Sequence, residues 1–132
     1  MSTFSTLPSF LLYLAGGLAC LGVFVTVYIR LTPFAEFKLI REGNIAAATA
    51  FTGALLGYAL PLSSAIAHSV TARDMVVWAL IGLVVQYLAH LLARQLLPNL
   101  NQEIHKNNAA MGLLSGGLSV VFGMINAACM VY

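Results

Sequence analysis

The stretch "EGNIAAATAFTGALLG", residues 42–57, places a run of small side chains directly after a charged segment. A similar stretch, "KNNAAMGLLSGGL", occupies residues 106–118 and begins 64 positions later. Each contains an Asn that suits the N-cap of a helix, and each continues as an apolar run rich in Gly and Ala. The two stretches therefore predict the starts of two related helices.

The composition of the chain predicts an integral membrane protein. Of its 132 residues, 61% are hydrophobic and 8% are charged, and the mean hydropathy is +0.93, whereas roughly a quarter of the residues of a soluble domain are charged. Four stretches without charges reach the roughly 20 residues needed to cross a bilayer, and we expect the first to be retained, not cleaved as a signal peptide. The four predicted spans are residues 7–29, 45–67, 75–93 (reaching 97 if Arg94 snorkels) and 109–132.

The basic residues predict how the spans are oriented. Five of the six lie in or beside the first and third connections, and only Arg73 lies in the second. By the positive-inside rule the first and third connections are cytoplasmic, and both termini are periplasmic. The net charge of +2 is therefore a topology signal, and we expect no nucleic-acid partner. The five residues on the predicted cytoplasmic side are Arg30, Lys38, Arg41, Arg94 and Lys106.

An offset of 64 also aligns Arg30 with Arg94, and Asn44 with Asn108. Two spans per copy would let both copies enter the membrane from the same side, which is a parallel repeat. The predicted fold class is thus an all-α membrane protein with four transmembrane helices, a parallel duplication of a two-helix unit with short amphipathic cytoplasmic elbows. The two repeats are residues 1–68 and 69–132.

The first elbow, residues 32–41, predicts a short helix lying in the membrane interface. Thr32 suits a cap and Pro33 the first helical position, while Phe34, Phe37 and Ile40 fall on one face.

Asn44 and Asn108 are predicted helix caps, and binding of a ligand or lipid headgroup is the alternative role. The small residues that follow them predict close packing between the second and fourth spans, as the inner helices, because helices in lipid associate through close backbone approach. The predicted packing positions are Ala46, Ala50, Gly53 and Gly57 in the second span, and Gly112, Gly116, Ser119 and Gly123 in the fourth.

Polar residues within the spans form two candidate sites. Gln86, His90 and Arg94 recur every four residues and form one stripe, for which an interhelical hydrogen bond and a proton relay are both open. A relay would need a buried carboxylate, and we expect none, because all four acidic residues fall in or beside connections. The second candidate lies near the outer side, where a helix interrupted for binding and a structural kink with an Asn hydrogen bond are the two readings. Its residues are Pro61, Ser63, Ser64 and Asn126.

No catalytic or metal-binding pattern is present in the sequence. It lacks His-Glu-x-x-His, Gly-x-Ser-x-Gly and a Gly-rich phosphate loop. The three histidines lie at different predicted depths, and the depths of Cys20 and Cys129 disfavour a disulfide between them. We therefore expect no enzyme, no cofactor and no metal site.

Residues 31–65, "LTPFAEFKLIREGNIAAATAFTGALLGYALPLSSA", and residues 123–132, "GMINAACMVY", resemble the YjfL-type family of small bacterial inner-membrane proteins of unknown function. The resemblance implies a four-span protein of the bacterial inner membrane whose genes often neighbour those of phage-shock-type membrane-stress proteins and ATP-grasp ligases. It implies no catalytic or binding residues.

Two function classes follow. The first is an oligomeric structural or assembly component, surrounded by membrane lipids, that recruits cytosolic membrane-stress proteins through its basic elbows. The second is a transporter or channel for ions or small solutes that uses the region of Pro61 and Asn126 and the stripe with His90. The scarcity of charges within the spans favours the first class.

The predicted orientation can be tested with fusions to the C-terminus. Because both termini are predicted to be periplasmic, a C-terminal alkaline phosphatase fusion should be active and a C-terminal GFP fusion should be dark. The opposite pattern, measured on the same membranes, would place the elbows in the periplasm.

Overall fold

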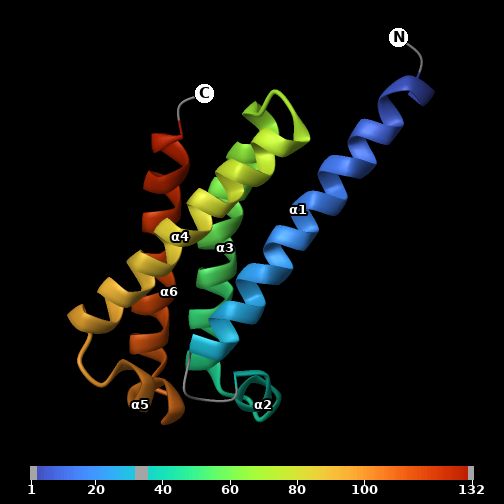
Figure 1. The fold of residues 1–132 in the computed structure, drawn as a ribbon. Helices are drawn as coiled ribbons and strands as arrows, with labels where there is room; N and C mark the ends of the chain where they lie inside the picture. Colours follow the sequence, from blue (N-terminus) through green and yellow to red (C-terminus); the bar gives the residue numbers. More distant parts are fainter. Residues whose placement is uncertain (1–2, 32–35, 131–132) are drawn as a thin grey trace.

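The computed structural model describes residues 3–31 and 36–130, and within them every regular element is a helix. Four helices are long and apolar enough to cross a membrane, which confirms the predicted all-α membrane fold (Figure 1). Two six-residue helices, α2 and α5, precede the second and fourth of them at one end of the bundle. The helices are α1 Thr3–Leu31, α2 Glu36–Arg41, α3 Ile45–His68, α4 Ala72–Leu96, α5 Leu100–His105 and α6 Ala109–Cys129.

The starts of α3 and α6 share one local design. The side chain of Asn44 accepts a hydrogen bond from the backbone N–H of Ala47 at 2.8 Å, and Asn108 accepts one from Met111 at 3.4 Å. The residue before each cap has a positive φ, 87° at Gly43 and 62° at Asn107. Both junctions therefore turn and cap in the same way, while the duplication of the whole two-helix unit stays a prediction.

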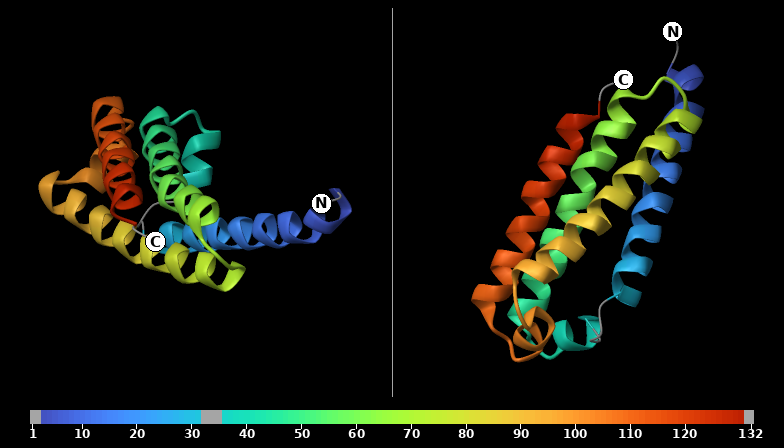
Figure 2. Two further views of the ribbon diagram at one scale, coloured as in Figure 1. Left: turned by 90° about the horizontal axis from the view of Figure 1, so that it is seen from above. Right: turned by 60° about the vertical axis from the view of Figure 1, so that its left-hand side comes forward.

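Helices α3 and α6 lie side by side along much of their length (Figure 2), and their glycines face one another at contact distance. A Cβ added to Gly116 would lie 2.6 Å from the carbonyl oxygen of Thr49, and one added to Gly53 would overlap the backbone of Gly116. One added to Gly112 would lie 2.6 Å from the Cα of Ala46. Real side chains do not approach a backbone this closely, so the interface requires glycine at these positions.

Helix α3 is the central helix of the bundle. About 56% of its most apolar window is buried, compared with 33% for both α4 and α6 and 17% for α1. The prediction that the second span is an inner helix therefore describes α3 well, whereas α6 is no more enclosed than α4.

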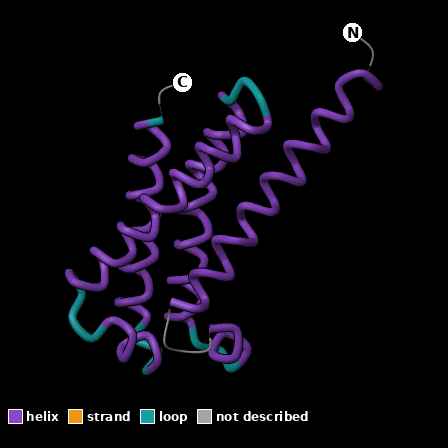
Figure 3. Tube along the Cα trace, in the orientation of Figure 1, coloured by secondary structure: helices purple, strands orange, loops and turns teal. Residues whose placement is uncertain are grey.

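Helix α1 is attached to the bundle mainly through aromatic rings near its C-terminal half. Phe24 stacks on Tyr58 of α3 with ring centroids 4.8 Å apart, and on Tyr87 of α4 at 5.5 Å. The hydroxyl of Tyr87 also donates to the carbonyl of Phe24 at 2.9 Å. Toward its N-terminus α1 diverges from the other helices, where Phe10 is exposed and available to lipid (Figure 1 and Figure 3).

The described part of the first elbow is the short helix α2. Thr32, Pro33 and Phe34 lie outside the described residues, and α2 begins at Glu36. Within α2 the buried side chains are Glu36 and Leu39, whereas Phe37 is exposed and its ring meets Phe51 edge-on. The described members of the predicted apolar face both make apolar contacts, since Phe37 meets Phe51 and Ile40 packs against the core. Leu39 joins a second apolar cluster at the base of the bundle. That cluster contains Leu39, Ala46, Ala47, Ala50, Leu100 and Ile104.

The glycine contact between α3 and α6 predicts how three substitutions affect stability. Gly53→Ala and Gly116→Ala should each lower the free energy of unfolding by about 1 to 3 kcal/mol, because the new methyl group meets backbone that cannot move aside. Gly22→Ala in α1 is the control, since a Cβ at that position also meets nothing within 4 Å. The measurement is the melting temperature of purified protein in detergent; equal melting of all three variants would contradict the close contact.

Candidate functional site

The polar stripe of α4 changes its surroundings from one turn to the next. Gln86 is 3% exposed, and its amide nitrogen donates to the backbone carbonyl of Ser119 in α6 at 2.9 Å. One turn further, the ring of His90 is half-buried and lies against Tyr28 of α1, with centroids 5.2 Å apart. One more turn along, Arg94 is half-buried in the last turn of α4. The structure thus keeps the predicted stripe on one face but divides it into separate environments.

A very small cavity lies beside the first two members of the stripe. Its volume is about 10 Å³, which is at most the space of one water molecule. The carbonyl oxygen of the Gln86 side chain and Nε2 of His90 are buried and have no hydrogen-bond partner among the described residues. Because both residues line the cavity, the polar interior at this depth is enclosed by packed side chains. The other lining residues are Phe24, Tyr28, Ala54, Tyr87 and Ser119.

A buried carboxylate lies near this stripe, contrary to the sequence-based expectation. Glu36 in α2 is only 2% exposed, and it lies close enough to Tyr28 to act on it electrostatically. Tyr28 in turn contacts His90. The expectation of no buried carboxylate was wrong because it placed Glu36 by its position in a connection, whereas α2 folds back against the bundle.

The second candidate site, near the opposite end of the bundle, contains no interrupted helix. Helix α3 continues through Pro61 as far as His68, so the predicted interruption is absent. Asn126 is buried and donates to the backbone carbonyl of Gly82 in α4 at 3.0 Å. A Cβ on Gly82 would also lie 3.2 Å from Pro61. The structure therefore brings Pro61 and Asn126 together around Gly82.

The two serines of this candidate site are less buried than Pro61 and Asn126. Ser63 is exposed and Ser64 is half-buried on α3. The carbonyl of Gly57, which loses its usual helical donor at Pro61, faces Gly123 of α6. Such a carbonyl is suited to a weak Cα–H···O contact between helices.

The two elbows are joined to each other through the cap of α3. Besides capping α3, Asn44 donates from its side-chain nitrogen to the carbonyl of Ile104 in α5 at 2.9 Å. The backbone N–H of Ala46 donates to the side chain of Asn107 at 3.1 Å. Asn108 caps α6 and also donates to the carboxylate of Glu103 at 2.9 Å. Four exposed side chains with basic groups flank this unit, namely Lys38, Arg41, His105 and Lys106.

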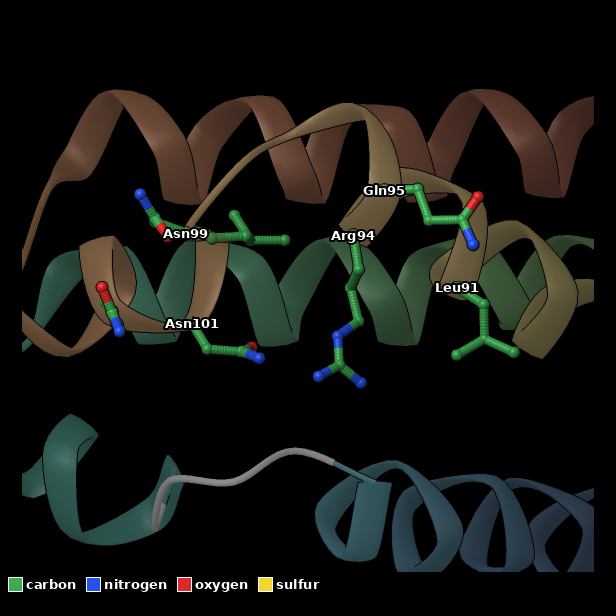
Figure 4. A pocket seen from close by; sticks show the side chains of 7 residues that line it. Leu91, Arg94, Gln95, Asn99 and Asn101 are labelled. Atoms are coloured by element: carbon green, nitrogen blue, oxygen red, sulfur yellow. The ribbon is translucent and has the colours of Figure 1, made fainter.

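A wide pocket lies where α4 ends and α5 begins, and Arg94 points into it (Figure 4). Its volume is about 620 Å³. Sequence reasoning missed this pocket, although four amide side chains between residues 95 and 102 are an unusual concentration just after an apolar span. The lining residues are Leu91, Arg94, Gln95, Asn99, Leu100, Asn101 and Gln102.

Metal-binding geometry is not found in the described ranges 3–31 and 36–130. No group of three or more His, Cys, Asp or Glu side chains there could hold a metal ion. Cys20 is buried, Cys129 is exposed, and neither forms a disulfide.

Comparison with known proteins places the chain among membrane proteins of one family. A family model described as Domain of Unknown Function (DUF350) matches residues 2–130. The chain is 38% identical to the UPF0719 inner membrane protein YjfL of Escherichia coli (strain K12) over 132 residues, which is all of both chains. It is 30% identical to the UPF0719 transmembrane protein YshE of Bacillus subtilis (strain 168) over 118 residues, 88% of each chain. No solved structure matches the chain.

Proposed function

Because this chain belongs to the DUF350 family and is a multi-pass protein of the inner membrane, we propose that it is an oligomeric assembly component of that membrane. Its cytoplasmic face recruits cytosolic membrane-stress proteins, and both of its termini are periplasmic. The observation that carries this proposal is that the buried polar side chains of the spans hold helices together.

Three buried polar side chains each form a hydrogen bond to the backbone of a neighbouring helix. Gln86 bonds the backbone of α6, Asn126 bonds the backbone of α4, and the hydroxyl of Tyr58 donates to the carbonyl of Ala79 at 2.8 Å. Each reaches a carbonyl on a neighbouring helix, which is how polar groups stabilise helix packing in lipid. A solute pathway instead needs polar groups that face a water-filled space, and the cavity beside Gln86 holds about 10 Å³.

The outer side of the α3–α6 pair supports the oligomeric part of the proposal. A shallow groove of about 390 Å³ lies between these helices and is lined largely by small residues, including Ala48, Thr52 and Gly117. Such a surface lets the backbone of another helix approach closely. We assign the groove to a second copy of the chain.

The elbows support the recruiting part. Lys38 and Arg41 of the first elbow and Lys106 of the second are exposed at the same end of the bundle. An acidic surface of a cytosolic partner fits this charge. Asn44 holds the two basic segments in a fixed arrangement, because it bonds both Leu39 of the first elbow and Ile104 of the second.

The burial of Glu36 supports a second candidate function, which is proton transfer. Glu36, Tyr28 and His90 form a row of titratable groups from the elbow into the bundle. Carboxylate and histidine chains of this kind carry protons in membrane pumps.

A liposome experiment separates the two functions. Purified protein in liposomes with an entrapped pH-sensitive dye should show no proton flux above protein-free liposomes between about pH 5 and 8, because the interior beside His90 is closed by packing. His90→Gln and Glu36→Gln should leave this rate unchanged. A flux that either substitution abolishes would reject the assembly function in favour of proton transfer.

The recruiting surface predicts a charge-dependent partner. Replacing Lys38, Arg41 and Lys106 together by Gln should reduce the amount of membrane-stress protein that co-purifies from membranes, with each charge contributing about 1 kcal/mol. Arg73→Gln is the control, because Arg73 lies in the first turn of α4, at the other end of the bundle. Equal recovery with the triple variant and the unsubstituted protein would rule out the elbows as the binding surface.

A further inference from the structure

We propose that the pocket between the end of α4 and the start of α5 binds a phosphate group, and that the ligand is the headgroup of an anionic phospholipid. Arg94 and Asn101 hold the phosphate, and Leu91 lies beside the acyl chains. This inference stands apart from the assembly function, since it rests on the residues of this pocket alone.

Arg94 is the cation of the site. It is half-buried, and no ion pair or hydrogen bond joins it to another described residue. A partly desolvated guanidinium is stabilised by an anion, and its planar pair of N–H donors fits two oxygens of a phosphate. None of the described residues lining the pocket is acidic, so no carboxylate of the pocket wall competes for Arg94.

Amide groups supply further donors around the cation. In Figure 4 the side chain of Asn101 points toward the guanidinium of Arg94, and this amide makes no hydrogen bond to another described residue. Asn99, at the start of α5, has a left-handed backbone with φ 59° and makes no capping bond with its side chain. An amide NH₂ carries two donors, so the rim of the pocket can bond both a phosphate and the hydroxyl groups of a headgroup.

The order of the side chains along the pocket favours a lipid over a free phosphate. Leu91 lies one turn inside the apolar span, Arg94 lies in its last turn, and the amides of Asn101 and Gln102 lie beyond it. The wall therefore changes from apolar to cationic to polar over the depth at which acyl chains give way to headgroups. A soluble phosphate compound has no acyl chain to contact the apolar part of the pocket wall.

The experiment measures ligand binding to the full chain in detergent by native mass spectrometry and by melting temperature. The probes are dioleoylphosphatidylglycerol, dioleoylglycerol, which lacks the phosphate, and inorganic phosphate. Phosphatidylglycerol should bind and raise the melting temperature, whereas dioleoylglycerol should not. Inorganic phosphate should bind at least about ten-fold more weakly, because it gains nothing from the apolar wall.

Substitutions then locate the site. Arg94→Gln should weaken phosphatidylglycerol binding about ten-fold or more, which is the effect of losing a charge-assisted pair of hydrogen bonds. Asn101→Ala removes one amide but leaves the charge of Arg94 in place. This variant should weaken phosphatidylglycerol binding about three-fold. Arg30→Gln is the matched control, because Arg30 is also in the last turn of a spanning helix at the same end of the bundle but does not line the pocket.

Three results would overturn the proposal. They are equal binding of phosphatidylglycerol by Arg94→Gln and the unsubstituted protein, an equal loss in Arg30→Gln, and binding of dioleoylglycerol as strong as that of phosphatidylglycerol. Inorganic phosphate binding as tightly as the lipid would keep the phosphate site and assign it to a soluble ligand.

Discussion

The contact between α3 and α6 without intervening side chains is the constraint on which the rest of the bundle depends. In lipid, apolar side chains gain little by exchanging acyl chains for a neighbouring helix, so the helices need close backbone approach and interhelical hydrogen bonds. The glycines at 53, 112 and 116 provide the approach. Gln86 and Asn126 then fasten α4 and α6 to each other, one from each helix. Each of these two buried polar residues therefore links α4 to α6.

Much of the fold could be predicted from the sequence because its signals are local. Span length, the Asn caps and the spacing of small residues depend on neighbours within a few positions, and α3 and α6 begin directly after Asn44 and Asn108. The aromatic contacts of Phe24 with Tyr58 and Tyr87 depend on how α1 crosses two other helices. No spacing along the chain encodes that crossing, and sequence reasoning missed it.

The candidate site was less predictable for the same reason. The stripe of Gln86, His90 and Arg94 follows from helical spacing, but the surroundings of each residue are set by other helices. Gln86 meets a backbone carbonyl of α6, while Arg94 opens onto a pocket completed by α5. Glu36 shows the same limit, because a residue in a short connection became one of the most buried side chains of the protein. Burial in a connection depends on how that connection folds back.

The elbows connect the proposed partner surface to the proposed lipid site. Leu100 of α5 lines the pocket near Arg94 and also belongs to the apolar cluster that includes Leu39 of α2. Asn44 bonds α5 to the start of α3. A ligand that binds one arrangement of α5 more tightly than another must, by linkage, change the affinity of a partner that also prefers one of these arrangements, and the partner must change the ligand's affinity by the same factor. A protein built in this way can report the composition of the surrounding lipid to a cytosolic partner without opening a path through its core.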